Sequence, residues 1–258
     1  MGGLFLKYRQ VTPDFNLVKK VPTAEAASLE SVLKAHERPD TEYRPALTYF
    51  KDNSALGRIF GMGMSCAGTC QVIHPAGYVL SSYHQLEEYI RNPDQKAYFH
   101  DAIIKDSYPI EILAYSKSSD LALFKIETSY EYPVVYIAEK SPKGSVFTSF
   151  FDNIGAVKNQ AMNVLSGNTS VATSAELELS ICAGRVVSHS ADGKYFTIQE
   201  TPDVSIERGN SGSPVWNLDN ELVGVSIEID LQGNVIFAGT RNIRSLLETY
   251  VTACKRSP

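Results

Sequence analysis

Short apolar runs alternate with turn residues along most of this chain. The runs are bounded by Gly, Pro and Asn, and this punctuation is typical of many short strands rather than of alternating strands and helices. We predict strands at residues 78–80, 110–115, 121–126, 145–151, 177–187, 195–200, 214–216, 222–229 and 235–238. The pattern therefore predicts an all-β fold.

The two ends of the chain have a different, helical pattern. Five apolar residues recur at helical spacing near the C-terminus: Ile243, Leu246, Leu247, Tyr250 and Val251. They predict a helix over residues 241–254. Near the N-terminus, Thr23 is predicted to cap a helix over residues 24–36. Pro39 and Pro45 then mark a linker, or a strap over the β structure.

The elements divide the chain into four parts. Residues 1–55 form a partly helical extension, and residues 56–140 form a first β unit. Residues 141–242 form a second β unit, with the crossing between the two at residues 139–144. Residues 243–258 contain the C-terminal helix and a short tail.

Composition agrees with a globular protein and excludes several partners. The chain has 258 residues, of which 43% are hydrophobic and 21% charged, so it can bury a sizeable core. The net charge is -5 without a long Lys/Arg block, which argues against nucleic acid and acidic lipid. No apolar stretch approaches the roughly 20 residues that cross a membrane. Residues 1–8 become polar too quickly for a secretory signal, so we expect an intracellular, cytoplasmic protein.

One turn carries a candidate nucleophile. The segment reads Gly209-Asn210-Ser211-Gly212-Ser213-Pro214 and precedes a predicted strand. Glycines on both sides of Ser211 allow backbone angles that present its side chain. They also turn the amides of Gly209 and Ser211 toward one point, where an oxyanion would form. The alternative is an ordinary turn, since the same residue types dominate turns generally.

Two further residues complete a catalytic order. His84 follows the predicted strand at residues 78–80, and Asp120 introduces the strand at residues 121–126. A histidine at a strand end can face a cleft, and the chain order is then His, Asp, Ser. Taken singly, each of these residues would more often be a solvated or packed side chain.

In this order the motifs resemble those of the chymotrypsin-like serine proteases. The resemblance is closest to the bacterial-type Deg/HtrA and glutamyl endopeptidase branch and covers about residues 63–247. It rests on residues 75–80 before His84, on residues 119–123 and on residues 209–214. It implies two six-stranded antiparallel β-barrels, a serine endopeptidase activity on protein or peptide substrates, and no cofactor. Only a short tail follows the last helix, so we expect no PDZ domain.

The resemblance implies a role for each site residue. His84 would take the proton of the Ser211 hydroxyl as the acyl bond forms. Asp120 would hold the imidazole tautomer and stabilise the imidazolium. The amides of Gly209 and Ser211 would bind the oxyanion, and Ser226 matches a position that supports the aspartate by hydrogen bonding.

The substrate pocket is predicted to be apolar. Its base includes Ser205 and Ile206, and one wall includes Val225, Ile227 and Glu228. No aspartate stands where the trypsin branch selects Lys or Arg. An uncharged P1 side chain is therefore favoured, because an unpaired buried charge costs several kcal/mol.

Two other function classes remain open. The chain is alternatively a pseudoprotease whose double barrel survives as a scaffold, because the bulky Tyr83 precedes His84 and could displace the imidazole. A third class is an adaptor that grips an extended peptide beside residues 226–228 without chemistry. No feature of the sequence indicates an oligomeric state.

The cysteines and Asn210 lead to two smaller predictions. Cys66, Cys70 and His74 are evenly spaced, but no fourth ligand is evident, so we predict packing cysteines and no metal site. Asn210 stands where trypsin-like zymogens place the aspartate that pairs with a new N-terminus. A neutral amide supplies no charge to pair with a buried ammonium, so we predict no activation of that kind and an oxyanion loop ordered by other contacts. Residues 1–55 either supply such contacts, or merely pack on the barrel or are partly disordered.

Overall fold

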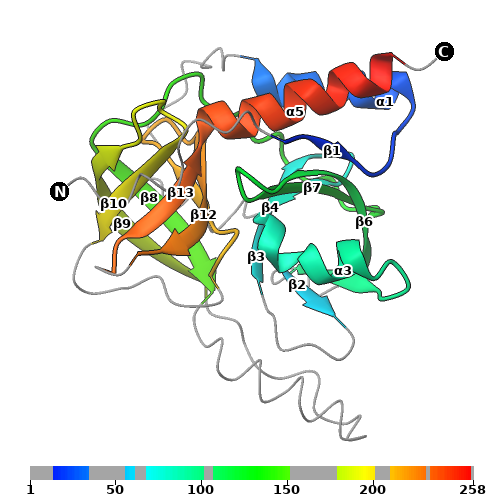
Figure 1. The fold of residues 1–258 in the computed structure, drawn as a ribbon, viewed down its shortest axis with the longest axis horizontal. Helices are drawn as coiled ribbons and strands as arrows, with labels where there is room; N and C mark the ends of the chain where they lie inside the picture. Colours follow the sequence, from blue (N-terminus) through cyan, green and yellow to red (C-terminus); the bar gives the residue numbers. More distant parts are fainter. Residues whose placement is uncertain are drawn as a thin grey trace, which may run out of the picture.

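The computed structural model describes residues 14–34, 56–61, 68–101, 107–151, 179–200, 210–230 and 233–256. Two β structures lie side by side, and a long C-terminal helix runs across both (Figure 1). The all-β prediction is confirmed.

The first β structure is a seven-stranded antiparallel sheet. Its strands are β1 (Asn16–Leu17), β2 (Leu56–Gly61), β3 (Gly68–His74), β4 (Tyr78–Ser81), β5 (Ala97–Asp101), β6 (Ser107–Ser116) and β7 (Leu121–Ile126). The order is β1-β6-β5-β2-β3-β4-β7, and a further pairing of β6 with β7 brings β2 to β7 round into a ring. Strand β1, from the N-terminal extension, adds to β6. The short helices η3 (Tyr83–Gln85) and α3 (Glu87–Arg91) follow β4.

The second β structure is a closed six-stranded barrel. Its strands are β8 (Ser145–Phe151), β9 (Leu179–His189), β10 (Tyr195–Glu200), β11 (Pro214–Trp216), β12 (Leu222–Ile229) and β13 (Val235–Gly239). They close in the order β10-β13-β12-β11-β8-β9. Phe196 and Phe237 stack inside it with ring centroids 5.2 Å apart. Residues of β11 and β13 are buried at every position, and this burial of β-branched and aromatic side chains favours strands here.

Helix α5 (Thr240–Lys255) joins the two β structures into one core. Its apolar face packs in a single cluster with residues of α1, β4, β7, β12 and β13. Arg244 donates hydrogen bonds from this helix to the carbonyls of Ile137 (3.0 Å) and Leu33 (2.8 Å). The predicted C-terminal helix is confirmed. Among the described helices, none is long and apolar enough to cross a membrane.

The N-terminal helix differs from the prediction. Helix α1 (Thr23–Ser28) begins at Thr23, so Pro22 and not Thr23 is the N-cap. Pro22 adopts an extended conformation, and Thr23 Oγ1 donates to the Cys254 carbonyl at 3.5 Å instead of capping. The chain then tightens into the 3-10 helix η2 (Leu29–Leu33). Packing against α5 therefore decides where this helix begins, rather than the local capping preference of Thr23.

The described cysteines are packing residues. Cys70, Cys182 and Cys254 are buried, carry no disulfide and lie in three different hydrophobic clusters. Cys66 lies outside the described residues. His74 Nδ1 accepts a hydrogen bond from the Ala76 amide (3.1 Å) in the β3–β4 turn. The described part of the Cys66, Cys70 and His74 series is thus used for packing and turn formation.

Candidate active site

The turn before β7 holds Asp120 in an uncommon backbone conformation. Asp120 has a φ of 50°, which places a non-glycine residue in the left-handed region. The preceding residues are fixed from two sides. The Ser118 amide donates to Asp14 Oδ1 in the N-terminal extension (2.8 Å), and the Ser118 carbonyl accepts from the Tyr195 hydroxyl of the second barrel (2.6 Å). These contacts compensate the cost of the conformation, which is about 1–3 kcal/mol.

His84 and Asp120 are joined by two hydrogen bonds. His84 Nδ1 lies 2.7 Å from Asp120 Oδ2, and the His84 amide donates to Asp120 Oδ1 at 2.9 Å. The Tyr83 amide also donates to the Asp120 carbonyl (3.1 Å). The structure therefore brings two members of the predicted triad into contact, with the imidazole held at its Nδ1 atom.

The charges around His84 favour its protonated form. Burial lowers the pKa of this histidine, but the hydrogen bond and the charge of Asp120 raise it, with further contributions from Glu87 and Glu228. The net result is a pKa above the ordinary value of 6.5. The side chain is 40% exposed, so solvent screens part of this effect.

Tyr83 packs away from the imidazole. Its ring is buried and stacks on Tyr115 with centroids 5.0 Å apart, and its hydroxyl donates to Glu87 Oε1 at 3.1 Å. Lys117 Nζ lies 5.6 Å from the ring centroid. The bulky residue before His84 consequently leaves the contact between His84 and Asp120 intact.

The candidate nucleophile lies on a turn anchored to both β structures. The Thr69 amide of β3 donates to the Ser211 carbonyl (2.9 Å), and the Gly212 amide donates to the Ser226 carbonyl of β12 (2.7 Å). The Ser226 amide donates in turn to the Ser213 carbonyl (2.8 Å). Gly212 has a φ of 87° and lies so close to Thr69 that no side chain fits. This local packing explains why glycine follows Ser211.

Among the described residues, no hydrogen bond joins the hydroxyl of Ser211, the third predicted member of the triad, to His84. Instead, His84 Nε2 lies 3.0 Å from Nε2 of Gln85. Gln85 was not among the predicted site residues, and its position directly after His84 is the one sequence feature that points to it.

Two residues were predicted to support the triad, Gly209 by an oxyanion amide and Ser226 by a hydrogen bond to Asp120. Gly209, predicted to give one oxyanion amide, lies outside the described residues. Ser226 contacts the nucleophile turn through its backbone, and in the described ranges its hydroxyl makes no hydrogen bond to Asp120. In the described part of the N-terminal extension, Asp14 contacts the turn of Asp120.

The predicted pocket wall stays a prediction. Val225 and Ile227 are 0% and 5% exposed and pack in the core cluster shared with α5. Successive side chains of a strand point to opposite faces, and residues 222–227 of β12 are all buried, so both faces of this part of the strand are covered. Glu228 is exposed, and its charge acts on His84, which places it on the side of the site. Ser205 and Ile206 lie outside the described residues.

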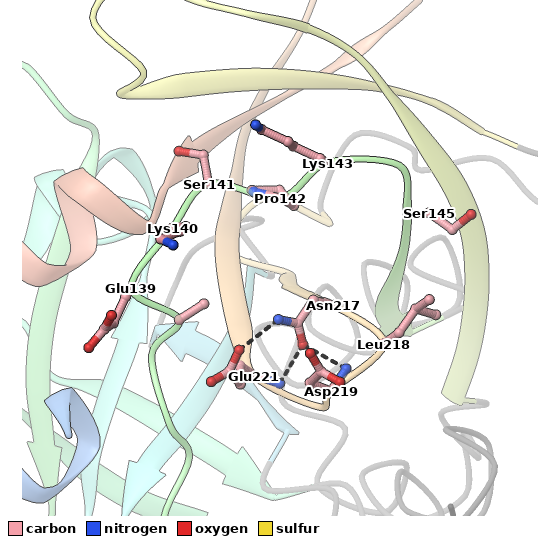
Figure 2. A pocket seen from close by; sticks show the side chains of 11 residues that line it. Glu139, Lys140, Ser141, Pro142, Lys143, Ser145, Asn217, Leu218, Asp219 and Glu221 are labelled. Carbon is pink, nitrogen blue, oxygen red and sulfur yellow. Dashed lines mark hydrogen bonds between the residues drawn. The ribbon is translucent and has the colours of Figure 1, made fainter. Parts of the chain in front are cut away.

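Two pockets of the described surface lie away from these residues. Figure 2 shows one of about 540 Å³, lined by the crossing between the β structures and by the β11–β12 turn. The other, of about 490 Å³, lies at the start of α5. Their linings mix acidic and basic side chains and include no predicted site residue. Neither pocket therefore adds a residue to the predicted site of His84, Asp120 and Ser211.

Comparison with known families gives the class of the protein. Residues 68–225 match the family model described as a trypsin-like peptidase domain. The chain belongs to this family. The prediction of a serine endopeptidase with a trypsin-like fold is thereby confirmed at the level of the family.

Individual relatives of this trypsin-like peptidase agree with the family. A "Probable periplasmic serine endoprotease DegP-like" of Chlamydia pneumoniae is 25% identical over 240 residues, which cover 88% of this chain and 43% of that protein. The chain thus spans less than half the length of this relative. The crystal structure of the serine endoprotease from Yersinia pestis has a TM-score of 0.58 at 16% identity, over 83% of this chain and 68% of that one. Deg5 has a TM-score of 0.56 at 17% identity, over 81% and 95%. These two structures show the fold.

The comparison also corrects the expected location. The Chlamydia pneumoniae relative is named as a periplasmic protein, which contradicts the intracellular, cytoplasmic location expected from residues 1–8. That expectation depended on the polarity of residues 1–8, which lie outside the described residues.

Proposed function

We propose that this trypsin-like peptidase is a serine endopeptidase that cleaves protein or peptide substrates through an acyl-enzyme on Ser211. The observation that carries the proposal is the 2.7 Å contact between His84 Nδ1 and Asp120 Oδ2. With Nδ1 held by Asp120, Nε2 is the ring nitrogen that accepts the proton of the serine hydroxyl, as a general base requires. Ser211 supplies the nucleophile from a turn fixed to both β structures.

The chemical steps use only residues of this chain. Ser211 Oγ attacks the carbonyl carbon of the substrate while its proton passes to His84 Nε2. Asp120 stays ionised and stabilises the imidazolium. The amides of Ser211 and Gly209 hold the oxyanion. The imidazolium then protonates the leaving amine as the peptide C–N bond breaks, and a water molecule, deprotonated by the same imidazole, hydrolyses the ester.

Two features of specificity and activation belong to the same proposal. An uncharged P1 side chain is favoured, with Glu228 disfavouring acidic residues near His84. Asn210 is buried, and its Oδ1 has no hydrogen-bond partner among the described residues. Its neutral amide supplies no charge for an ion pair with a new N-terminus at the position that controls trypsin-like zymogens. We infer that the chain does not require a new N-terminus for activity.

One observation favours a second function, a catalytically inactive scaffold that binds extended peptides. The Ser211 hydroxyl makes no hydrogen bond to His84 in the described part of the chain, and Gln85 occupies the imidazole nitrogen instead. A scaffold would bind peptides along β12 without acylation.

Covalent labelling by a fluorophosphonate separates the two functions. The folded wild-type chain should be labelled and should cleave a quenched fluorescent peptide library. Ser211→Ala should not be labelled, because the oxygen that the phosphorus binds is absent, and its cleavage rate should fall by about 10⁴-fold. Ser245→Ala, which removes a serine from α5, is the matched control and should behave as wild type. Absence of labelling in folded wild-type protein would leave the scaffold as the function.

A further inference from the structure

Both ring nitrogens of His84 have a partner in the resting structure. Nδ1 contacts Asp120 at 2.7 Å, and Nε2 lies 3.0 Å from the amide nitrogen of Gln85. An amide nitrogen only donates, so Nε2 of the imidazole is the acceptor and the ring proton is on Nδ1. This is the tautomer of a general base. The lone pair that would receive the Ser211 proton, however, is already engaged.

The side chain of Gln85 lies in a slot that glycine creates. A Cβ atom built on Gly68 would lie 2.5 Å from Gln85 Oε1 and 2.6 Å from its Cδ. Contacts of that length do not occur, so any larger residue at position 68 would push the Gln85 amide out of its place. Gly68 is followed by Thr69, whose amide holds the Ser211 carbonyl at 2.9 Å. The Gln85 amide therefore lies between the imidazole and the strand that anchors the nucleophile.

The competition between Gln85 and Ser211 has a chemical consequence. The Ser211 hydroxyl must donate to Nε2 before it can be deprotonated. The Gln85 amide can donate to the same lone pair but cannot transfer its proton at neutral pH. While that hydrogen bond persists, Asp120 orients the imidazole correctly, but His84 cannot accept the Ser211 proton.

We propose that Gln85 is a latch on His84, which keeps the general base disengaged from Ser211 until the Gln85 side chain leaves the slot over Gly68. The inference rests on the proposed function, since it assigns a resting state to the same site. It makes Gln85 a positioning residue that acts through His84.

Two variants release the latch by different routes. Gln85→Ala removes the amide, and Gly68→Ala fills the slot that the amide occupies. Gln95→Ala, at an exposed glutamine of the same β structure, is the matched control. With a small fluorophosphonate, the second-order labelling rate should rise about fivefold in Gln85→Ala, as expected for loss of one competing hydrogen bond. Gly68→Ala should follow in the same direction, and Gln95→Ala should match wild type.

A second measurement does not depend on activity. Nitrogen-15 NMR of the histidine ring reports the protonation of His84 in each variant. A donor to Nε2 stabilises the neutral ring, so its removal in Gln85→Ala should raise the pKa of His84 above that of wild type. A purely structural role of Gln85 would not move this titration.

The outcomes separate the latch from the proposed function. Faster labelling together with a raised pKa in Gln85→Ala supports the latch. Labelling that is unchanged or slower in Gln85→Ala, while wild type is labelled, overturns it and leaves Gln85 neutral or helpful to catalysis. If no variant is labelled, the proposed function fails, and the NMR titration alone decides whether Gln85 holds Nε2; an unchanged pKa then overturns the latch as well.

Discussion

Replacing Gly212 with alanine should destabilise the protein far more than the same change at a comparable turn glycine. Gly212 has a φ of 87°, and a Cβ atom there would lie 1.9 Å from the Thr69 carbonyl oxygen and 2.4 Å from Ser81 Oγ. The Ser81 hydroxyl is itself fixed by donation to the Thr69 carbonyl at 2.8 Å. Neither obstacle is the flexible end of a long side chain, so the backbone must move.

The expected loss has two parts. The left-handed conformation costs alanine about 1–2 kcal/mol relative to glycine. Movement of the turn by about an ångström would also break the hydrogen bond from Thr69 to the Ser211 carbonyl or the one from Gly212 to the Ser226 carbonyl, each worth about 1 kcal/mol. Buried groups left without partners add to this, so we expect a loss of about 3–5 kcal/mol in the free energy of unfolding.

Gly233→Ala is the matched control. Gly233 has a φ of 82°, and nothing lies within 4 Å of a Cβ atom built there, so only the conformational cost of about 1–2 kcal/mol applies. Guanidinium unfolding measures both losses, and fluorophosphonate labelling measures the displacement of Ser211. Equal losses of stability in the two variants would show that the close approach of Gly212 to Thr69 does not exist in solution.

Three further predictions follow from the hydrogen bonds around Asp120. The rate of Ser211 labelling should increase with pH, with a midpoint above 6.5, because the pKa of His84 is raised and only the neutral imidazole is a base. Asp120→Asn should lower this midpoint and should slow labelling by about 10⁴-fold. A wild-type midpoint at or below 6.5 contradicts this. Tyr195→Phe removes the 2.6 Å hydrogen bond to the Ser118 carbonyl. The free energy of unfolding should fall by about 1 kcal/mol, and Ser211 labelling should slow. An unaltered labelling rate would show that this hydrogen bond does not position Asp120. Burial raises the pKa of Asp14, but its hydrogen bonds, led by the one from the Ser118 amide, lower this pKa overall. The stabilising effect of Asp14 should therefore be present above pH 3.8 and disappear as the pH falls through the lowered pKa. Acid unfolding of Asp14→Ala and of wild type measures this effect, and identical unfolding curves would refute it.

Strand boundaries were predictable where turn residues stand on both sides of an apolar run. The predicted strands at residues 121–126, 145–151, 195–200 and 222–229 have the observed bounds. The N-terminal helix was less predictable, because its start depends on contacts with α5 more than 200 residues away in the sequence. Local capping preference of Thr23 contributes about 1 kcal/mol, which tertiary packing can override.

The candidate site was predictable as residues but not as a resting state. The order of His84, Asp120 and Ser211 follows from motif spacing, and the contact of the first two agrees with it. The place of Gln85 depends on the empty space over Gly68, which is brought near only when β3 and η3 pack together. Gln85 and Ser211 compete for one nitrogen atom, His84 Nε2, and no sequence periodicity or motif encodes this competition. The sequence alone therefore did not indicate it.

The two turns that carry the candidate catalytic groups are each fixed by the opposite β structure. The Ser211 carbonyl, presented by the second barrel, accepts from Thr69 of the first sheet, whereas the Ser118 carbonyl, beside Asp120 of the first sheet, accepts from Tyr195 of the second barrel. These reciprocal bonds couple the geometry of the site to the packing of the two β structures. A small separation of the barrels would break both at once and move Ser211 and Asp120 apart before either barrel unfolds. Helix α5 packs on strands of both β structures, so replacing apolar residues on this face with alanine should weaken the contact between them. In such a variant, Ser211 labelling should be lost at a lower denaturant concentration than the β structure, measured by circular dichroism.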